Sequence, residues 1–360
     1  MMLNPLVSIV IPIYNRANTL HYCINSVLSQ DYVNWELLLV DDGSTDRSSE
    51  ICKEYTEKDE RIRYFYQENK GAGPARNYGL KEAKGAWITF VDSDDAIMSN
   101  HLSQIVFELC GSYDLIMVNH CKATYEEGKL RKANDYWSNI PSQEVCGKKD
   151  VMLFLYKTLN PYKYYNYCCW DKFFRKETIE KYDVLFPEDV PTGQDMMFVN
   201  DFLKYVDRFY YSSVGTYVPT PMGNEGIEHL ALIMRKPEEY FYCHCRNYDM
   251  LMQLYKTTGV EVVRRYAAHY VVCDTFVRCI VRYTHWRTRR ILGKDAVMGF
   301  MQSSLKNFLE QVREDIEYVK EPVYKKQCYK ILDGKPSKVY DHWFYKNLLN
   351  DLYYAIKRRF

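Results

Sequence analysis

The sequence predicts an α/β protein with a mostly parallel, Rossmann-like sheet covered by helices on both faces, followed by a mainly helical C-terminal region. In the first third of the 360-residue chain, short β-branched runs alternate with helical patterns of about a dozen residues. Several of the strand-like runs are apolar throughout, as expected of strands buried on both faces. Beyond about residue 226, apolar and aromatic residues recur at helical spacing instead.

Four strands and three helices are predicted in the first hundred residues. The strands are LVSIVIPIYN, WELLLVDD, RIRYFYQE and WITFVDSDD, at residues 6–15, 35–42, 61–68 and 87–95. The helices are predicted between them, at residues 19–30, 46–55 and 73–85. Thr19 is the expected cap of the first helix, and Gly85 closes the third. A further helix and strand are predicted between Leu102 and Asn119.

The composition is that of an ordinary folded protein. Hydrophobic residues make up 47% and charged residues 26%, and a formal net charge of +1 does not indicate nucleic acid as a partner. No apolar run reaches the roughly 20 residues that span a bilayer, and no cleavable leader is evident, so we expect a cytoplasmic protein. The 12 cysteines form no paired CxxC framework, which favours free thiols over zinc, including at Cys243 and Cys245.

Polar side chains follow three of the predicted strands at their carboxyl ends. They are Tyr14 and Asn15, then Asp41 and Asp42, then Asp92 and Asp94. In a parallel sheet these ends meet at one edge, where ligands bind. A single acidic strand end is equally well a helix cap or a solvated loop, which is our interpretation of Asp46 and Asp95. Three such ends favour a ligand site, and two carboxylates spaced by one residue suit a hard divalent cation.

The chain resembles the family 2 glycosyltransferases, whose nucleotide-binding half has the GT-A fold. The resemblance lies in VSIVIPIYN, DDGSTD, GAGPARNYGL and FVDSDD, the last similar to the family's Asp-X-Asp motif. It covers roughly the first hundred residues. It implies a metal-dependent, inverting transfer of a sugar from a nucleotide donor, with UDP expected, to a hydroxyl acceptor.

The resemblance also implies roles for individual residues. Those expected to hold the nucleotide donor are Pro12, Tyr14, Asn15, Asp41, Asp42, Arg76 and Asp92. Tyr14 would stack on the base, Asp42 would accept from a base N–H, and Arg76 would face the nucleotide. Asp94 would bind the metal ion, Mn²⁺ or Mg²⁺, with Asp92 beside it.

The segment NYCCWDKFFRKETIEKYDVLFPEDVPTGQDMMFVNDFL, residues 166–203, resembles the family's second signature. There a Trp-X-Lys strand and a helix precede a Glu-Asp pair, which here reads Gln194-Asp195. The resemblance implies that Asp195 is the catalytic base and that Trp170, Lys172 and Gln194 lie on the acceptor side. Without it, Asp195 is equally well a carboxylate stabilised at a helix start. Because Gln194 replaces a negative neighbour, we expect a lowered pKa for Asp195.

Three regions are expected along the chain. Residues 1–105 form the nucleotide-sugar-binding half of the GT-A domain, residues 106–225 its acceptor and catalytic half, and residues 226–360 a helical region. Arginines in the helical pattern at residues 260–290, and in the terminal YAIKRRF, have two interpretations. The first is a helix that packs one face and solvates the other. The second is a basic face contacting anionic lipid headgroups or a lipid diphosphate acceptor, peripherally on the inner face of the membrane.

The function predicted from these patterns is a hexosyl- or N-acetylhexosaminyltransferase. Its expected acceptor is a glycan or lipid-linked glycan of a bacterial surface polysaccharide or cell envelope. An alternative is a catalytically weak scaffold subunit of a glycan-assembly complex, motivated by Gln194 and by a divergent segment after Tyr210. That segment leaves the loop over the donor unpredicted, and we interpret its His229 as a surface residue. A sugar-nucleotide pyrophosphorylase is disfavoured, because IPIYNRANTL stands where its glycine-rich phosphate loop would lie.

Overall fold

The computed structural model describes residues 4–126, 129–135, 140–159, 168–219, 237–274, 286–319 and 322–343. The chain divides into two compact units, Met1–Gly223 and Asn224–Phe360. His229, the part of the divergent segment beyond residue 219, and the terminal YAIKRRF fall outside the described residues. The predicted functional division of the first unit at residue 105 stays a prediction, since one sheet runs through both halves.

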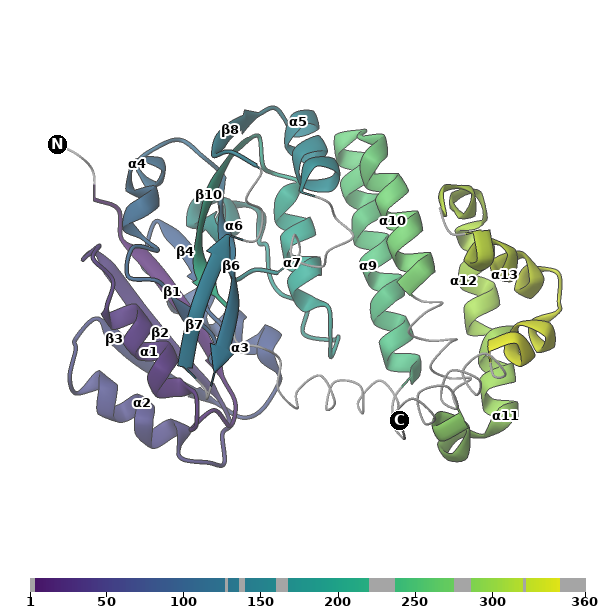
Figure 1. The fold of residues 1–360 in the computed structure, drawn as a ribbon, viewed down its shortest axis with the longest axis horizontal. Helices are drawn as coiled ribbons and strands as arrows, with labels where there is room; N and C mark the ends of the chain where they lie inside the picture. The colour runs from purple at the N-terminus through teal and green to yellow at the C-terminus, as the bar shows by residue number, and fades with distance from the viewer. Residues whose placement is uncertain are drawn as a thin grey trace. The chain divides into compact units, whose positions relative to one another are not determined.

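The first unit is built on one sheet of ten strands (Figure 1). Along the sheet the order is β3 (Ile62–Gln67), β2 (Trp35–Asp42), β1 (Val7–Ile13), β4 (Trp87–Phe90), β9 (Lys172–Arg175), β6 (Leu115–Glu126), β10 (Arg208–Val218) and β5 (Ala96–Ile97), with β7 (Lys129–Asp135) on β6 and β8 (Gln143–Cys146) on β10. The four strands predicted from the first hundred residues pair in parallel. Since β9 runs antiparallel to both β4 and β6, the remainder of the sheet is mixed.

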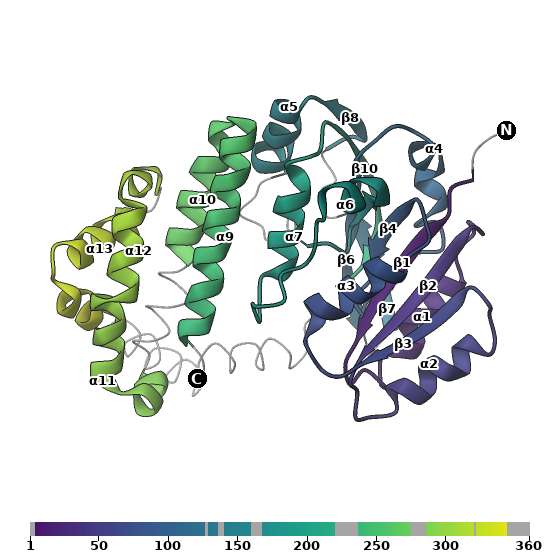
Figure 2. The ribbon, with the colours of Figure 1, turned by 180° about the vertical axis from the view of Figure 1, so that it is seen from behind.

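Helices cover both faces of the parallel strands, as the apolar runs predicted. The helices α1 (Leu20–Leu28), α2 (Ser48–Thr56) and α3 (Ala72–Glu82) follow β1, β2 and β3 in turn. Figures 1 and 2 show α1 and α2 on one face and α3 on the other. Every residue of β1 is buried. Its Ile9 and Ile11 pack in the same core as Ile24 of α1, whereas Val10 lies against Gly79 of α3. The α/β class predicted from the sequence is therefore confirmed.

The second half of this unit contributes shorter helices. These are α4 (Val106–Leu109), α5 (Lys148–Leu153) with a π-helical turn at Phe154–Thr158, α6 (Lys176–Tyr182) and α7 (Gln194–Leu203). Thr19 is the N-cap residue of α1, as predicted, but its side chain makes no capping hydrogen bond. Its hydroxyl donates to the carbonyl oxygen of Ser93 at 3.1 Å, which ties α1 to the loop after β4.

The second unit is helical, as predicted. Its helices include α9 (Pro237–Thr258), α10 (Glu261–Asp274), α11 (Trp286–Gln302), α12 (Ser304–Gln311) and α13 (Pro322–Leu332). On α10, Arg264 Nε donates to Asp315 Oδ1 at 2.7 Å, and Asp315 is buried. The packing interpretation therefore holds for Arg264. No helix in the described ranges is long and apolar enough to cross a membrane.

Candidate functional site

The loops after β1 and β2 are held together at the carboxyl edge of the sheet. Asn15 Oδ1 accepts a hydrogen bond from the backbone N–H of Thr45 at 2.8 Å. The backbone N–H of Asn15 donates to Ser44 Oγ at 3.0 Å. This exchange fixes Asn15 in a left-handed conformation with φ of 53°, which asparagine tolerates better than most residues. The neighbouring Tyr14 is 46% exposed, so its ring is accessible for the stacking predicted for it, a role that stays a prediction.

Asp42, buried at the end of β2, shapes the loop that leads into α3. Its Oδ1 accepts from the backbone N–H of Lys70 at 2.8 Å and from Gln67 Nε2 at 2.7 Å. Its Oδ2 accepts from the N–H of Gly71, which adopts a φ of 101°. Three protein donors thus occupy a carboxylate that offers about four lone-pair sites. The predicted contact of Asp42 with a base stays a prediction, and the observed role is to hold this loop.

Asp41, the preceding residue, is fully buried and also serves the protein. Its Oδ1 accepts from the backbone N–H of Ser44 at 2.8 Å, and its Oδ2 accepts from the hydroxyl of Tyr64 at 2.9 Å. Asp41 therefore supports the turn that carries the partners of Asn15. Pro12 lies inside β1, opposite Val40 of β2, and its predicted contact with the nucleotide stays a prediction.

One guanidinium joins two of the predicted carboxylates. Arg76, in α3, donates through Nη2 to Asp92 Oδ1 at 2.9 Å and through Nη1 to Asp195 Oδ1 at 2.8 Å. The arginine side chain is 7% exposed, whereas those of Asp92 and Asp195 are 31% and 29% exposed. The sequence separates Arg76 from Asp195 by 119 positions. The structure therefore brings a strand end, a helix start and the predicted base into one cluster, which we call the Arg76 bridge.

The pKa of Asp195 is raised above the ordinary value of an aspartate. Burial raises it first and the nearby charge of Asp92 raises it further, while Arg76 and the Cys169 thiol act in the opposite direction without cancelling the increase. The predicted effect of Gln194 is a comparison with a glutamate at the same position, and it stays a prediction. A buried carboxylate is harder to ionise whatever its sequence neighbour. Asp195 does lie in the first turn of α7, as predicted.

Two residues of this cluster gave no signal in the sequence. Tyr217, fully buried in β10, accepts from the backbone N–H of Asp92 at 3.2 Å and donates to Asp95 Oδ2 at 2.7 Å. Its ring stacks on Trp170 at a centroid distance of 4.3 Å. Cys169 is a buried thiol whose pKa burial raises well above its ordinary value, so it stays protonated and can donate to Asp195. Only the fold brings these two side chains to the site.

The residues predicted on the acceptor side lie beneath the site. Lys172 is fully buried in β9, and its ammonium donates to Asp171 and to the carbonyl oxygen of Cys168. Gln194 donates through Nε2 to the carbonyl oxygen of Val190 at 2.5 Å. Both residues therefore hold neighbouring backbone and side chains in this structure. Their predicted contact with an acceptor stays a prediction.

Asp92 and Asp94 are the residues that could hold a divalent cation. Both follow β4, their side chains are partly exposed, and carboxylate oxygens are the ligands that Mg²⁺ and Mn²⁺ prefer. Arg16 Nη2 lies 3.8 Å from Asp94 Oδ2. The described residues include no cluster of three or more metal-ligating side chains. This donor set fits a metal ion that takes its remaining ligands from phosphate and water, as Mg²⁺ commonly does.

Comparisons with known proteins agree with the fold and the motifs. The family model described as Glycosyl transferase family 2 matches residues 8–182. Glycosyltransferase GlyA of Streptococcus pneumoniae is 30% identical over 59% of this chain and 31% of its own length. The uncharacterized glycosyltransferase EpsJ of Bacillus subtilis is 31% identical over 59% of this chain and 60% of its own length. The chain thus spans less than two thirds of either relative.

A solved structure resembles the chain over nearly all of its length. The crystal structure of residues 1–349 of S. aureus TarS in complex with UDP covers 96% of this chain and 91% of its own, with a TM-score of 0.66 and 19% identity. The same TarS fragment has also been solved in complex with UDP-GlcNAc. At this identity the likeness shows the fold.

Proposed function

Because the chain belongs to glycosyl transferase family 2 and has the GT-A fold, we propose that it transfers a sugar from a UDP-linked donor to a hydroxyl acceptor with inversion. The Arg76 bridge is the observation that carries the proposal. It holds Asp195, a carboxylate with a raised pKa, at the edge of the sheet where Asp92 and Asp94 follow β4. The UDP and UDP-GlcNAc complexes of TarS support the choice of donor.

Asp195 is the proposed general base. A carboxylate with a raised pKa is a stronger base than an ordinary one, yet remains largely ionised at a pH above that pKa. It removes the proton of the acceptor hydroxyl as the oxygen attacks the anomeric carbon opposite the leaving diphosphate. One base and one displacement invert the configuration. Arg76 binds both Asp195 and Asp92. It therefore fixes the position of the proposed base relative to the residues proposed to bind the donor.

Asp94 and Asp92 are the proposed residues for Mn²⁺ or Mg²⁺. Such an ion would supply positive charge to the diphosphate as it leaves. Tyr14 is the proposed stacking residue for the base. GlyA and EpsJ both come from bacteria, and we propose a bacterial surface polysaccharide or a lipid-linked envelope glycan as the product.

The test is release of UDP from a panel of UDP-sugars in the presence of manganese. The wild-type chain is expected to release UDP from at least one donor, and Asp195→Asn is expected to lower that rate at least about a hundredfold, since a positioned base contributes about 10²–10⁴. Asp201→Asn is the matched control. It lies on the same helix, pairs with Lys204 and is 24% exposed. If UDP-sugars bind but none is turned over, the chain is a scaffold rather than an enzyme. If Asp195→Asn keeps full activity, the chain is an enzyme but Asp195 is not its base.

A further inference from the structure

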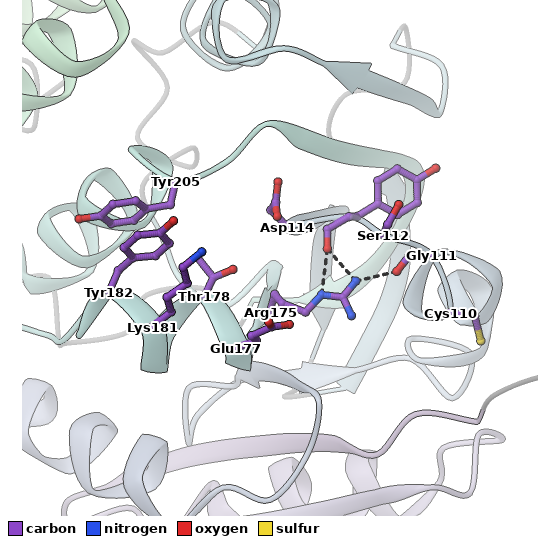
Figure 3. Close-up of a pocket in the computed structure, with 11 residues that line it drawn as sticks. Cys110, Gly111, Ser112, Asp114, Arg175, Glu177, Thr178, Lys181, Tyr182 and Tyr205 are labelled. Carbon is purple, nitrogen blue, oxygen red and sulfur yellow. Dashed lines mark hydrogen bonds between the residues drawn. The ribbon is translucent and has the colours of Figure 1, made fainter.

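A cavity lies near the amino-terminal end of β4, whereas the Arg76 bridge lies beyond the carboxyl end of that strand. It has a volume of about 480 Å³ and is formed by the loop before β6, the end of β9, α6 and the residue Tyr205 after α7 (Figure 3). Arg175 lines it and pairs with Trp87, the first residue of β4. Asp92 lies two residues beyond the other end of that four-residue strand, roughly 17 Å from Trp87 along an extended chain. The two sites therefore lie at opposite ends of β4.

The loop at residues 110–114 forms one wall of this cavity and is held by several hydrogen bonds. Arg175 donates through Nε to the carbonyl oxygen of Tyr113 at 3.0 Å, and through Nη2 to those of Gly111 and Tyr113 at 2.6 and 2.8 Å (Figure 3). Its guanidinium also lies 4.1 Å from the ring centroid of Trp87. Asp114 Oδ2 accepts from the backbone N–H groups of Asp207 and Arg208, both at 2.9 Å. The loop is thus built in place and needs no ordering by a ligand.

Another part of the lining is a stacked pair of tyrosines, Tyr182 and Tyr205. The rings of Tyr182, at the end of α6, and Tyr205 lie 3.8 Å apart at an angle of 5°. Tyr182 is 41% exposed, so part of its ring is accessible to a ligand. The ammonium of Lys181 lies 4.9 Å from the ring centroid of Tyr182. An exposed cation–π contact of this kind contributes only about 0.5–1 kcal/mol, so a ligand can displace it.

The charges of the lining balance. Asp114 and Glu177 carry two negative charges, and Arg175 and Lys181 carry two positive ones. A balanced lining disfavours a strongly charged ligand such as a nucleotide. Hydroxyl groups add neutral donors and acceptors beside the exposed ring, and they come from Ser112, Tyr113, Thr178, Tyr182 and Tyr205. Polar groups converging beside an aromatic surface, in a cavity within the roughly 300–1,000 Å³ range of ligand sites, suit a neutral polyhydroxylated ligand.

We propose that this cavity is a second carbohydrate site, which binds a neutral oligosaccharide while the Arg76 bridge holds the donor. The choice of a glycan among neutral polar ligands rests on the proposed function. The site would anchor a glycan chain at a distance from the reacting hydroxyl. Because the two sites share no lining residue, we expect donor and glycan not to compete directly for binding.

Cys110 makes the proposal testable without knowledge of the natural glycan. It is an exposed thiol that lines the cavity, while Cys146 is an exposed thiol outside it. Alkylation of both by N-ethylmaleimide is followed by mass spectrometry, with neutral tetrasaccharides of glucose, galactose, mannose and N-acetylglucosamine and with an anionic uronic acid tetrasaccharide. At about ten times the Kd, a bound glycan slows alkylation of Cys110 about tenfold, as 1 + [L]/Kd requires, and leaves Cys146 unchanged.

Variants assign the protection to the cavity. Tyr182→Ala and Lys181→Ala are expected to weaken protection, and the second changes only an exposed side chain. Tyr22→Ala, which removes a tyrosine of 46% exposure from α1, is the matched control and keeps full protection. UDP with manganese is expected neither to protect Cys110 nor to compete. The proposal is overturned if no neutral tetrasaccharide protects, if UDP competes, or if both cavity variants protect as well as wild type. The dependence of UDP release on Asp195 is measured in a separate assay. The proposed transferase function and the proposed glycan site can therefore each fail alone.

Discussion

Replacing Arg76 by methionine tests whether the bridge holds the site together. The substitution keeps an extended side chain of similar length but removes the donors to Asp92 and Asp195. Each hydrogen bond to a charged group contributes about 1.5–3 kcal/mol. Because the two carboxylates are 31% and 29% exposed, water replaces part of the loss. We therefore expect the free energy of unfolding to fall by about 2–3 kcal/mol, less than the 3–5 kcal/mol of a fully buried broken pair.

The assay is urea denaturation of the full chain, followed by the fluorescence of its tryptophans. A double-mutant cycle of Arg76→Met with Asp195→Asn isolates the coupling between the two side chains, which we expect to be about 1–3 kcal/mol for contacting residues. Arg76→Met should also raise the pKa of Asp195 further, since the arginine lowers it and Asp92 raises it. A loss below about 0.5 kcal/mol with no coupling, at the level of an ordinary surface substitution, refutes the reasoning.

Three further predictions concern stability around the site. The raised pKa of Asp195 favours its protonated form in the folded state, so its contribution to stability is lost as pH rises through the folded pKa from near 3.8. The Asp195→Asn variant should therefore gain stability relative to wild type as the pH rises above about 4, and urea midpoints of the two proteins that move together would contradict this. Tyr217→Phe removes both hydroxyl contacts with the loop after β4 and should cost about 1–2 kcal/mol in thermal or urea unfolding, whereas an unchanged midpoint would show that the loop holds without it. Gly79→Ala places a methyl carbon 2.3 Å from Val10 Cγ1 and should lower the free energy of unfolding by about 1–3 kcal/mol. The control is Gly299→Ala, where the added carbon meets nothing within 4 Å, and this variant is expected to keep wild-type stability.

Much of the fold could be predicted because each strand of the first hundred residues carries its own pattern. Apolar β-branched runs indicated burial on both faces, and the polar residues that end them indicated one shared edge. The mixed half of the sheet could not be predicted in the same way. β9 has only four residues, and its antiparallel pairing with both β4 and β6 depends on contacts between distant segments.

The candidate site was predicted as a set of residue types, not as an arrangement. Motif resemblance named Arg76, Asp92 and Asp195, but their joining into one bridge spans 119 positions and follows only from the packing of α3 and α7 against the end of β4. Cys169 and Tyr217 carry no local pattern that distinguishes them from core residues. The raised pKa of Asp195 could not be predicted from the sequence, because burial is a property of the fold.

The most direct test of the account is calorimetric titration of the full chain with UDP, with and without manganese. The account predicts that wild type binds UDP, that manganese strengthens the binding, and that Asp94→Ala removes the manganese effect while unfolding at the same urea concentration as wild type. Well-folded protein that binds no UDP under either condition, or an Asp94→Ala variant that keeps the full manganese effect, would contradict the assignment of the donor site to the carboxyl end of β4.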